Sequence, residues 1–461
     1  MLQKHRTLII IITAGLMLAG LVAVFGSTAG LKLEHQTGWH FTDVHDLQIS
    51  KSRNNPIAQK KIAPKRLIRT DSLSQKEISR LDTLKLKQTL LENFAIGKDK
   101  TCLDAFFTAL DKCGDSVVHI WYYGDSQIEA DRVTGELRDM MQSRFGGSGT
   151  GYVPLSDLAT FRYFEMKTGP SLVKLNCFNN RGNKGFGFAG KVYKFNVKDS
   201  AFKPTTGIKV SKALRYSKLY LTYGQHNGGI VKMYGADSQA ISVSIPMQTT
   251  SGRILLSDKG PHGNLKFSLP SNGNYFGLMF EGNKGIQIDN CGIRGHSGDG
   301  LKYISDAVLN KDAAMWNAKL IVFSFGNNMI PVLKSGKKNM DFYTRYFEGI
   351  FSKFRKAIPD ASILVISAGD MGTVIQGEET GYPNVAEFVE AMRVAAMNTG
   401  CAFFDAHAMI AKDGGILGWK KYGYAGLDGH LSLAGQRKYA KEIYSSLIYE
   451  YEMYQILHTS P

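Results

Sequence analysis

Residues 117–130 read VVHIWYYGDSQIEA, and this stretch decides how the chain is expected to fold. The run at 117–123 is apolar, β-branched and aromatic, which predicts a strand buried on both faces. After the turn GDSQ at 124–127, apolar residues recur at helical spacing as far as Phe145. A strand, a tight turn and a helix in this order indicate an α/β fold.

The rest of the chain divides this α/β domain into two parts. Strand–helix alternation resumes at about residue 290, with predicted strands at 320–325, 362–368 and 401–404 and helices between them. Between the two parts, alternating apolar residues with Gly, Asn and Ser turns predict an all-β sandwich. We therefore expect a three-layer α/β/α doubly wound parallel sheet that is interrupted by an inserted β domain. The expected boundaries are a signal peptide or anchor at 1–30, a basic linker at 31–85, the α/β domain at 86–160 and 290–461, and the β domain at 161–289.

Composition narrows the class of protein. A hydrophobic fraction of 43% and a charged fraction of 21% over 461 residues are ordinary for globular domains. The net charge is +16, and residues 51–70 hold seven Lys or Arg and no acid. Because zinc-finger spacing and an aromatic-basic RNA-binding pattern are lacking, this basic segment favours a solvated linker over a nucleic-acid site. The five scattered cysteines form no CxxC pair, so we expect buried free thiols, with a bridge between Cys102 and Cys113 as the alternative.

The N-terminal residues suggest a location. Lys4, His5 and Arg6 precede an uncharged run at 8–25, which is about the minimum length for a membrane span. Positive charges before such a run place the rest of the chain outside the cytoplasm. We expect a periplasmic or other extracytoplasmic protein, anchored to the inner membrane by this segment. A cleaved signal peptide is the alternative.

The turn at 124–127 supplies a candidate nucleophile. In parallel sheets, ligands bind beyond the carboxyl ends of the strands, so Ser126 is expected to be accessible there. Backbone N–H groups at the head of the following helix would then face the ligand. Gly124 permits a close approach, and Asp125 is expected to brace the turn. The alternative is that Ser126 only caps the helix.

Three further motifs lie where the α/β pattern resumes or near its end. Gly326 and Asn328 follow a predicted strand and would direct a side-chain amide at a developing oxyanion, unless they form an ordinary turn. Gly295 is expected to lend a backbone N–H to the same oxyanion. In DGHLS at 428–432, His430 is a candidate base that Asp428 would orient, and a surface loop is the alternative.

The order Ser126, Gly295, Asn328 and His430 resembles the four blocks of the SGNH (GDSL-like) hydrolase superfamily, over roughly residues 115–450. The stretches GDSQIEADR from residue 124 and FGGSGTGYVP from residue 145 resemble envelope esterases that remove O-acetyl groups from peptidoglycan. Relatives of those esterases carry a β domain like a carbohydrate-binding module at the position of the insertion.

This resemblance implies a role for each motif residue. Ser126 would be the nucleophile, His430 its base, and Asp428 the acid of the triad. Ser126, Gly295 and Asn328 would form the oxyanion hole, and neither a metal nor a cofactor would be needed. One departure concerns the acid, because the family usually places it three residues before the histidine, where this chain has Leu427.

The resemblance also implies a function. The protein would be a cell-envelope serine carbohydrate esterase that deacetylates a cell-wall or exopolysaccharide through an acyl-enzyme. One alternative is a polysaccharide O-acetyltransferase that uses the same residues beside a membrane acyltransferase partner. Another is a non-enzymatic glycan-binding envelope protein, against which the intact Ser, Asn and His count. Nucleic acid is not an expected partner.

Overall fold

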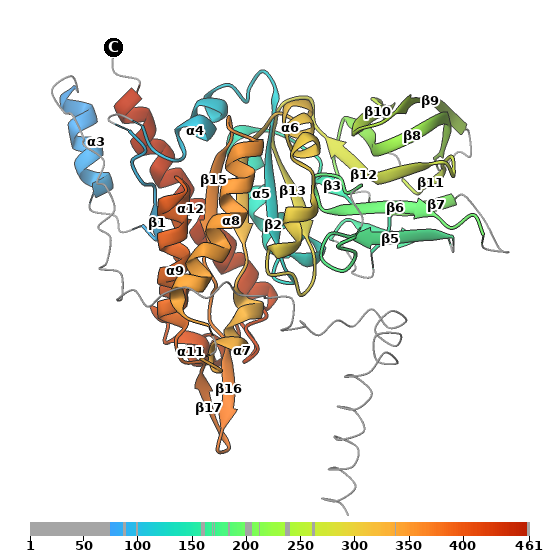
Figure 1. Cartoon of the computed structure of the whole chain (residues 1–461). Coiled ribbons are helices and arrows are strands. Elements are labelled where there is room, and N and C mark those ends of the chain that lie inside the picture. Colours follow the sequence, from blue (N-terminus) through green and yellow to red (C-terminus); the bar gives the residue numbers. More distant parts are fainter. Residues whose placement is uncertain are drawn as a thin grey trace, which may run out of the picture. The chain divides into compact units, whose positions relative to one another are not determined.

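The computed structural model describes most of the chain from residue 74 onward (Figure 1). The described ranges are 74–85, 89–97, 100–157, 162–167, 169, 171–182, 185–198, 205–211, 213–235, 240–260, 263–336 and 338–458. The predicted anchor at 8–25 and all of the predicted linker before residue 74 lie outside the described residues. The end of that predicted linker is helical, as α3, Gln75–Lys85.

The first sheet has six strands, and all but one of them are parallel. Its core strand is β2, Val117–Gly124, and each of its last seven residues is buried, as the apolar run predicts. β1 pairs antiparallel with β18 at one edge, which differs from the purely parallel prediction. The strand order is β1 (Leu91–Glu92), β18 (Ala402–Phe404), β15 (Ser362–Ile366), β14 (Ala318–Ser324), β2 and β13 (Gly285–Gly292).

Helices cover both faces of this sheet, and the carboxyl ends of its parallel strands meet at one edge. α5 and α12 pack together against one face, while α6, α8 and α9 lie on the other (Figure 1). The helices are α4 (Asp104–Asp111), α5 (Arg132–Phe145), α6 (Asp306–Met315), α7 (Ile330–Leu333), α8 (Met340–Ala357), α9 (Val385–Asn398), α10 (Ala406–Ala411), α11 (Gly415–Lys421) and α12 (Leu433–His458).

Helix α8 shows why such segments fold as predicted. Asn339 caps its N-terminus, with the side chain accepting a hydrogen bond from the backbone N–H of Phe342 at 3.0 Å. Phe347 and Phe354 recur on one face of the helix and are buried against the sheet. Pro359 follows the helix, and α8 ends at Ala357 because proline is disfavoured within a helix.

The second sheet has ten strands, including those of the predicted β region. They are hydrogen-bonded into one sheet that encloses its own apolar core, rather than into the two separate sheets of the expected sandwich. The strand path is β4 (Phe164–Lys167), β7 (Thr205–Val210), β11 (Leu265–Ser268), β8 (Lys218–Tyr234), β12 (Gly273–Glu281), β6 (Lys191–Phe195) and β5 (Leu172–Asn176). β9 (Ala240–Gln248) and β10 (Gly252–Ser257) pair with β8, and β3 (Gly151–Val153) pairs with β12. A two-stranded hairpin, β16 (Gly372–Ile375) and β17 (Glu378–Gly381), belongs to neither sheet.

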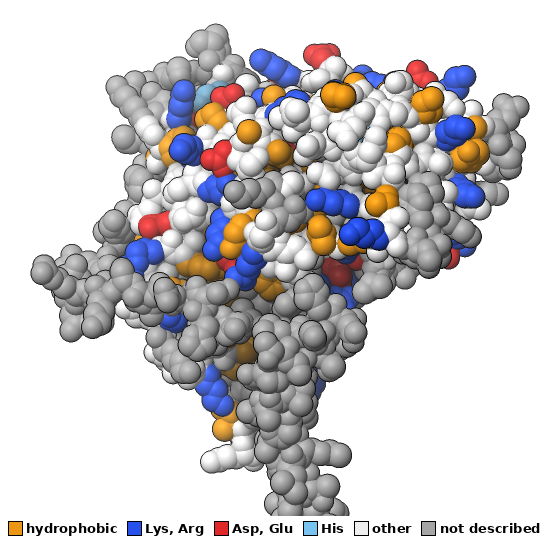
Figure 2. Space-filling model, turned by 45° about the vertical axis from the view of Figure 1, so that its right-hand side comes forward, with side chains coloured by type: hydrophobic (Ala, Val, Ile, Leu, Met, Phe, Trp, Pro, Cys, Tyr) orange, Lys and Arg blue, Asp and Glu red, His pale blue; other side chains and the backbone are white. Residues whose placement is uncertain are grey.

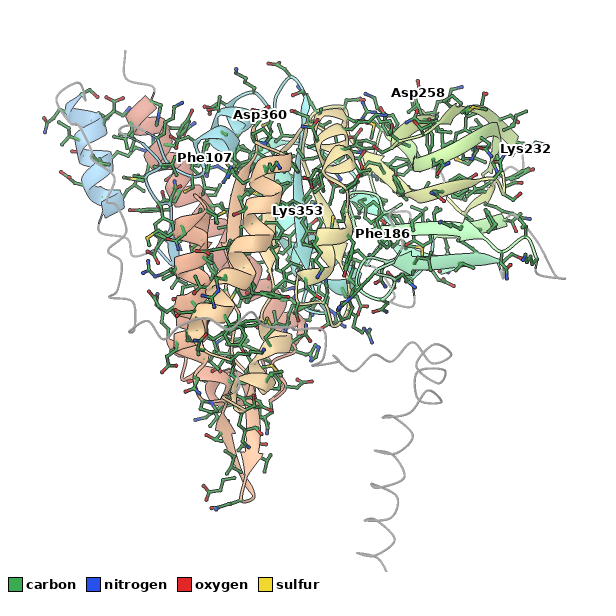
Figure 3. The ribbon with its side chains drawn as sticks, viewed as in Figure 1. Phe107, Phe186, Lys232, Asp258, Lys353 and Asp360 are labelled. Carbon is green, nitrogen blue, oxygen red and sulfur yellow. The ribbon has the colours of Figure 1, made fainter. Side chains whose placement is uncertain are left out.

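The two sheets share a buried junction. Phe188, from the segment between β5 and β6, stacks on Trp121 of β2 with ring centroids 4.4 Å apart. Phe186, labelled in Figure 3, is fully buried in the core of the six-stranded sheet. All five cysteines of the chain are buried free thiols, so the predicted alternative of a disulfide is wrong.

The expected membrane anchoring and extracytoplasmic location need correction. Among the described residues, no helix combines the length and the apolar character that crossing a bilayer requires. The longest described helix, α12, is a packed helix of the α/β domain, with one face buried against α5. The prediction of an anchored protein is therefore not supported by this structure.

Candidate active site

Ser126 lies in the turn directly after β2, at the carboxyl edge of the first sheet. The last residue of the strand, Gly124, packs tightly against its surroundings. A Cβ atom at this position would lie 3.0 Å from the backbone oxygen of Ser324 and 3.0 Å from the side chain of Ile128. A glycine is therefore the residue that lets the turn leave the sheet here.

The helix after the turn begins later than expected. α5 starts at Arg132, because Ala130 and Asp131 have left-handed backbone with φ of 60° and 66°. The buried Asp131 carboxylate accepts hydrogen bonds from both terminal nitrogens of Arg138, at 2.6 and 2.7 Å, which holds this kink in place. Ser126 thus lies in an irregular segment and does not cap α5.

The side chains of Ser126, His430 and Asp428 form a continuous hydrogen-bonded chain. Ser126 Oγ is 2.9 Å from His430 Nε2, and His430 Nδ1 is 2.9 Å from Asp428 Oδ2. The other carboxylate oxygen accepts a hydrogen bond from the backbone N–H of His430 at 3.2 Å. Gly429 lies between them with φ of +79°, a backbone conformation that turns the chain sharply. This turn is how an aspartate only two residues before the histidine reaches its ring.

Two carboxylates near the serine differ in their surroundings. Burial raises the pKa of Asp125 to about 6, against the opposing effects of the Gln127 backbone N–H and the His430 ring. For Asp428, partial burial raises the pKa, but the hydrogen bonds from the His430 side chain and backbone outweigh it and leave the pKa below its usual value. Asp428 is therefore fully ionised at neutral pH, while Asp125 is close to its titration range.

The predicted oxyanion residues lie beside this chain of hydrogen bonds. The amide nitrogen of Asn328 donates to Asp125 Oδ2 at 2.8 Å and lies 3.3 Å from the carbonyl oxygen of His296. Gly326 has φ of +117°, and an added Cβ would lie 2.9 Å from the Cβ of Ala368, so glycine is required before Asn328. Gly295 has φ of +72° and precedes the buried His296.

The ring of His296 is neutral and structural. Burial and the Arg181 charge lower its pKa to about 3. Its Nε2 accepts a hydrogen bond from the backbone N–H of Gly300 at 3.0 Å. His296 therefore holds the loop after Gly295 in shape and is not a second base.

A loop of the β domain contacts the segment that contains Gly295. Phe178 follows β5, and its ring centroid is 5.3 Å from that of His296. An added Cβ at Gly295 would lie 3.8 Å from the Phe178 ring. The neighbouring Arg181 donates to Asp299 at 2.9 Å, which ties the same loop to the short helix Asp299–Tyr303. The β domain thus contacts the segment that follows Gly295.

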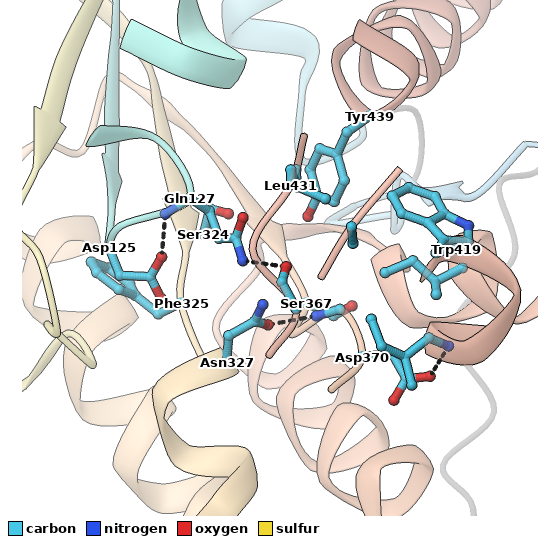
Figure 4. Close-up of a pocket in the computed structure, with 15 residues that line it drawn as sticks. Asp125, Gln127, Ser324, Phe325, Asn327, Ser367, Asp370, Trp419, Leu431 and Tyr439 are labelled. Carbon is cyan, nitrogen blue, oxygen red and sulfur yellow. Dashed lines mark hydrogen bonds between the residues drawn. The ribbon is translucent and has the colours of Figure 1, made fainter. Parts of the chain in front are cut away.

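Gln127 joins the serine turn to the histidine loop. Its amide nitrogen donates to the carbonyl oxygen of Gly429 at 2.8 Å (Figure 4). Behind this contact lies a cavity of about 20 Å³, enough for one water molecule, lined among others by Asp125, Asn327 and Trp419. This volume is too small for a sugar, and Ser126 is not among the residues that line the cavity.

Arg294 and Glu129 brace the mouth of the site. The Arg294 guanidinium donates to both carboxylate oxygens of Glu129, at 3.1, 3.0 and 2.6 Å, and so links the turn after Ser126 to the segment before Gly295. The sequence did not predict the Arg294–Glu129 ion pair, nor the contacts made by Gln127 and Phe178. Each of these side chains contacts a residue that is distant in the chain. The only sequence signal was the basic residue in GIRG at 292–295.

Comparison with known proteins supports the assignment of the fold. No protein-family model matches the sequence, and no curated protein matches it. The structure is similar to one described as "Peptidoglycan O-acetylesterase in action", with a TM-score of 0.62 and 18% identity, covering 79% of this chain and 99% of that one. An acetylxylan esterase from Geobacillus stearothermophilus matches with a TM-score of 0.27 and 17% identity, covering 36% of this chain and 73% of that one. A family two carbohydrate esterase from Cellvibrio japonicus has a TM-score of 0.25 and 10% identity, covering 63% of this chain and 98% of that one.

The comparison defines the fold of this chain. An α/β domain is divided into two segments, and a second, ten-stranded sheet lies between them in the sequence. The arrangement of the chain is similar over most of its length to that of the peptidoglycan O-acetylesterase. The two more distant matches have TM-scores too low to support any finer conclusion.

Proposed function

We propose that the protein is a serine esterase that removes O-acetyl groups from a carbohydrate, such as peptidoglycan. The observation that carries this proposal is the hydrogen-bonded chain from Ser126 through His430 to Asp428. A serine hydroxyl becomes a nucleophile only when a base accepts its proton, and His430 Nε2 is within reach to do so.

The proposed reaction has two halves. As Ser126 Oγ attacks the acetyl carbonyl carbon, His430 Nε2 takes the hydroxyl proton and then delivers it to the departing sugar oxygen. Water next attacks the acetyl-serine while His430 accepts a proton from it. His430 then returns this proton to Ser126 Oγ as the bond from Oγ to the acetyl carbon breaks, which frees the serine and releases acetic acid that ionises to acetate. Asp428 keeps the Nδ1 proton in place and stabilises the imidazolium that forms in each half.

The negative charge that develops on the acetyl carbonyl oxygen needs hydrogen-bond donors. We assign this role to Asn328 and to the backbone N–H groups of Ser126 and Gly295. The Asn328 amide is held by Asp125 at 2.8 Å, so its weaker 3.3 Å contact with the His296 carbonyl is the one that an oxyanion would replace. Asp125 thus positions Asn328, which explains why a carboxylate is buried at this point.

Replacing Ser126 with Ala tests the proposal. The variant should lose at least about a thousandfold in turnover of a small activated acetyl ester, because no other nucleophile replaces the hydroxyl. A fluorophosphonate probe should label the parent once per chain and leave Ser126→Ala unlabelled. Ser79→Ala, at an exposed position on α3, is the matched control and should retain full activity and labelling.

A second assay of the parent separates hydrolysis from transfer. With O-acetylated peptidoglycan and an added oligosaccharide, an esterase releases free acetate, whereas a transferase yields acetylated oligosaccharide. Residual activity of Ser126→Ala above a tenth of the parent would contradict the assignment of the nucleophile.

A further inference from the structure

The outer face of the β domain carries a groove remote from Ser126. Three strands and the end of a fourth form its floor: β4, β7, β11 and β8. In register across them lie Lys167, Gly207, Lys266 and Tyr234. Directly opposed residues of antiparallel strands place their side chains on the same face, so these four form one row.

Gly207 makes the middle of this row hollow. Its backbone φ is not in the left-handed region, so turn geometry does not explain the glycine. An added Cβ would lie 3.6 Å from the Cβ of Lys167, which shows that the missing side chain would point into the row. With strands about 4.8 Å apart, Lys167 and Lys266 lie about 10 Å from each other across this gap.

Neighbouring rows extend the same surface. Lys209 is opposite Glu165, to which it is ion-paired at 3.0 Å, and Ser268 is opposite Thr205 and Lys232. The resulting groove has a volume of about 600 Å³ and is lined by hydroxyl, amide and lysine groups, with Ile208 and Leu265 buried beneath.

The charge of this face is positive. Lys167, Lys232 and Lys266 are exposed, and none of them makes an ion pair with a described residue. Figure 2 shows Lys and Arg side chains spread over the side of the molecule that the β domain presents. Lys232, labelled in Figure 3, lies on β8 at the end of the β domain away from the helices of the α/β domain.

We propose that this groove binds a segment of acidic polysaccharide. Its central row consists of Lys167, Gly207, Lys266 and Tyr234, and the neighbouring rows extend it. The two lysines would pair with carboxylate or other acidic groups on successive units, and the ring of Tyr234 and the hydroxyls of Thr205 and Ser268 would contact the sugars. A concave, hydroxyl-lined groove suits an extended glycan chain better than a flat lipid surface.

The proposal rests on the proposed function only in the choice of a glycan as the ligand. Because the groove is far from the serine, it would hold the polymer while the α/β domain acts on it. Loss of the groove should therefore weaken binding and raise KM for a polymeric substrate, and leave turnover of a small acetyl ester unchanged.

Binding of the whole chain to polygalacturonate, measured by calorimetry, tests the groove. The fully methyl-esterified polymer is the matched probe, because it has the same backbone without charge. We expect binding to polygalacturonate alone, and weaker binding at high salt because screening shortens the range of the attraction. The double variant Lys167→Gln/Lys266→Gln should bind about tenfold more weakly, since two surface charge pairs are lost.

Two control variants separate charge from general damage. Lys167→Arg/Lys266→Arg should retain binding, and Lys284→Gln, an exposed lysine in the turn between β12 and β13, should bind like the parent. Any one of three results would overturn the proposal. The protein could bind the methyl ester as strongly as polygalacturonate, or the double variant could bind like the parent. In a competition experiment, the protein could bind anionic vesicles or duplex DNA more strongly than polygalacturonate. Turnover of the small ester is measured in parallel, so a failed groove and a failed esterase give different results.

Discussion

The two aspartates beside Ser126 are suited to different tasks by their surroundings. Asp125 is buried, holds the Asn328 amide and titrates near pH 6, so its place is structural and its charge costs free energy. Asp428 has 66% of its side chain exposed and His430 has 49%, so their contact is partly screened by water. The geometry of a triad is therefore present, in a more solvated form than in enzymes with a buried aspartate.

Asp428→Asn measures how much this contact contributes. Because water can partly replace the exposed carboxylate, we expect kcat to fall by about ten- to a hundredfold, less than the roughly 10⁴-fold loss seen for a buried triad aspartate. His430→Ala should be far more severe, since Ser126 then has no base. The measurement is turnover of a small acetyl ester at neutral and raised pH.

Asp258→Asn, at an exposed position of the β domain, is the matched control and should have no effect. A loss below about threefold for Asp428→Asn, beside an inactive His430→Ala, would show that His430 works as the base without Asp428.

The segment after β5 links the inserted β domain to the chemistry. It reaches the active site through Phe178, which packs on His296, and through Arg181, which binds Asp299. Because the backbone of Gly295 is adjacent to this contact, we expect the position of its N–H to depend on a side chain from the other sheet. Oxyanion donors must be placed to within a few tenths of an ångström to be effective, so we expect this contact to influence turnover if Gly295 acts as proposed.

Phe178→Ala should therefore lower kcat. The half-buried ring contributes modestly to folding, so stability should fall by no more than about 2 kcal/mol. Turnover of the small ester should fall about tenfold with KM changed less than about twofold, because the donor for the transition state is displaced while ground-state contacts remain.

Val173→Ala, on the exposed face of β5, controls for a general effect of altering this strand. Steady-state kinetics and thermal unfolding of both variants check the prediction. An unchanged kcat for Phe178→Ala would show that the β domain does not support the oxyanion site.

Across the molecule, the two sheets are joined by a buried charged cluster as well as by apolar packing. His119 of β2 lies between Asp289 of β13 and Glu281 of β12, with 2.7 Å contacts to both. Burial alone would lower the pKa of His119, but the charges and hydrogen bonds of Asp289 and Glu281 raise it to about 9. The imidazole is therefore positively charged at neutral pH and neutralises part of the charge of the two acids that surround it.

This cluster predicts a loss of stability at alkaline pH. The pKa of His119 is about 9 in the folded protein, against 6.5 for an ordinary histidine. Protonated His119 therefore contributes its full stabilisation below pH 6.5, and this contribution is lost as the pH rises through about 9. The shift corresponds to about 3 kcal/mol in the free energy of unfolding. Denaturant unfolding of the parent and of Glu281→Gln between pH 6 and 10 measures it.

In Glu281→Gln, one of the two acids that raise the pKa is removed, so the decline should begin at lower pH than in the parent. Superimposable pH profiles of the two proteins would contradict the role assigned to the cluster.

Local sequence patterns account for much of the fold. The apolar run of β2 and the apolar spacing with flanking cap and proline in α8 predict elements that the structure contains, because hydrophobic period and caps act within a few residues. The start of α5 and the joining of the β-domain strands into a single ten-stranded sheet were not predictable in this way. The first depends on a kink held by Arg138, and the second on pairing between strands that are distant in the chain.

The sequence by itself determined which side chains could act and where each stands relative to a strand end. Ser126 after β2 and Asp428 with His430 before α12 follow from local motifs alone. Only the tertiary structure decided that Asp428 reaches His430 from two residues away, that Asn328 is held by Asp125, and that Phe178 of the β domain packs on His296 next to Gly295. The physical reason differs between these contacts. The contacts of Asn328 and Phe178 join segments that are distant in the chain, and the packing of the two sheets sets the distance between them. The contact of Asp428 depends on the conformation of a backbone turn, which residue spacing does not reveal.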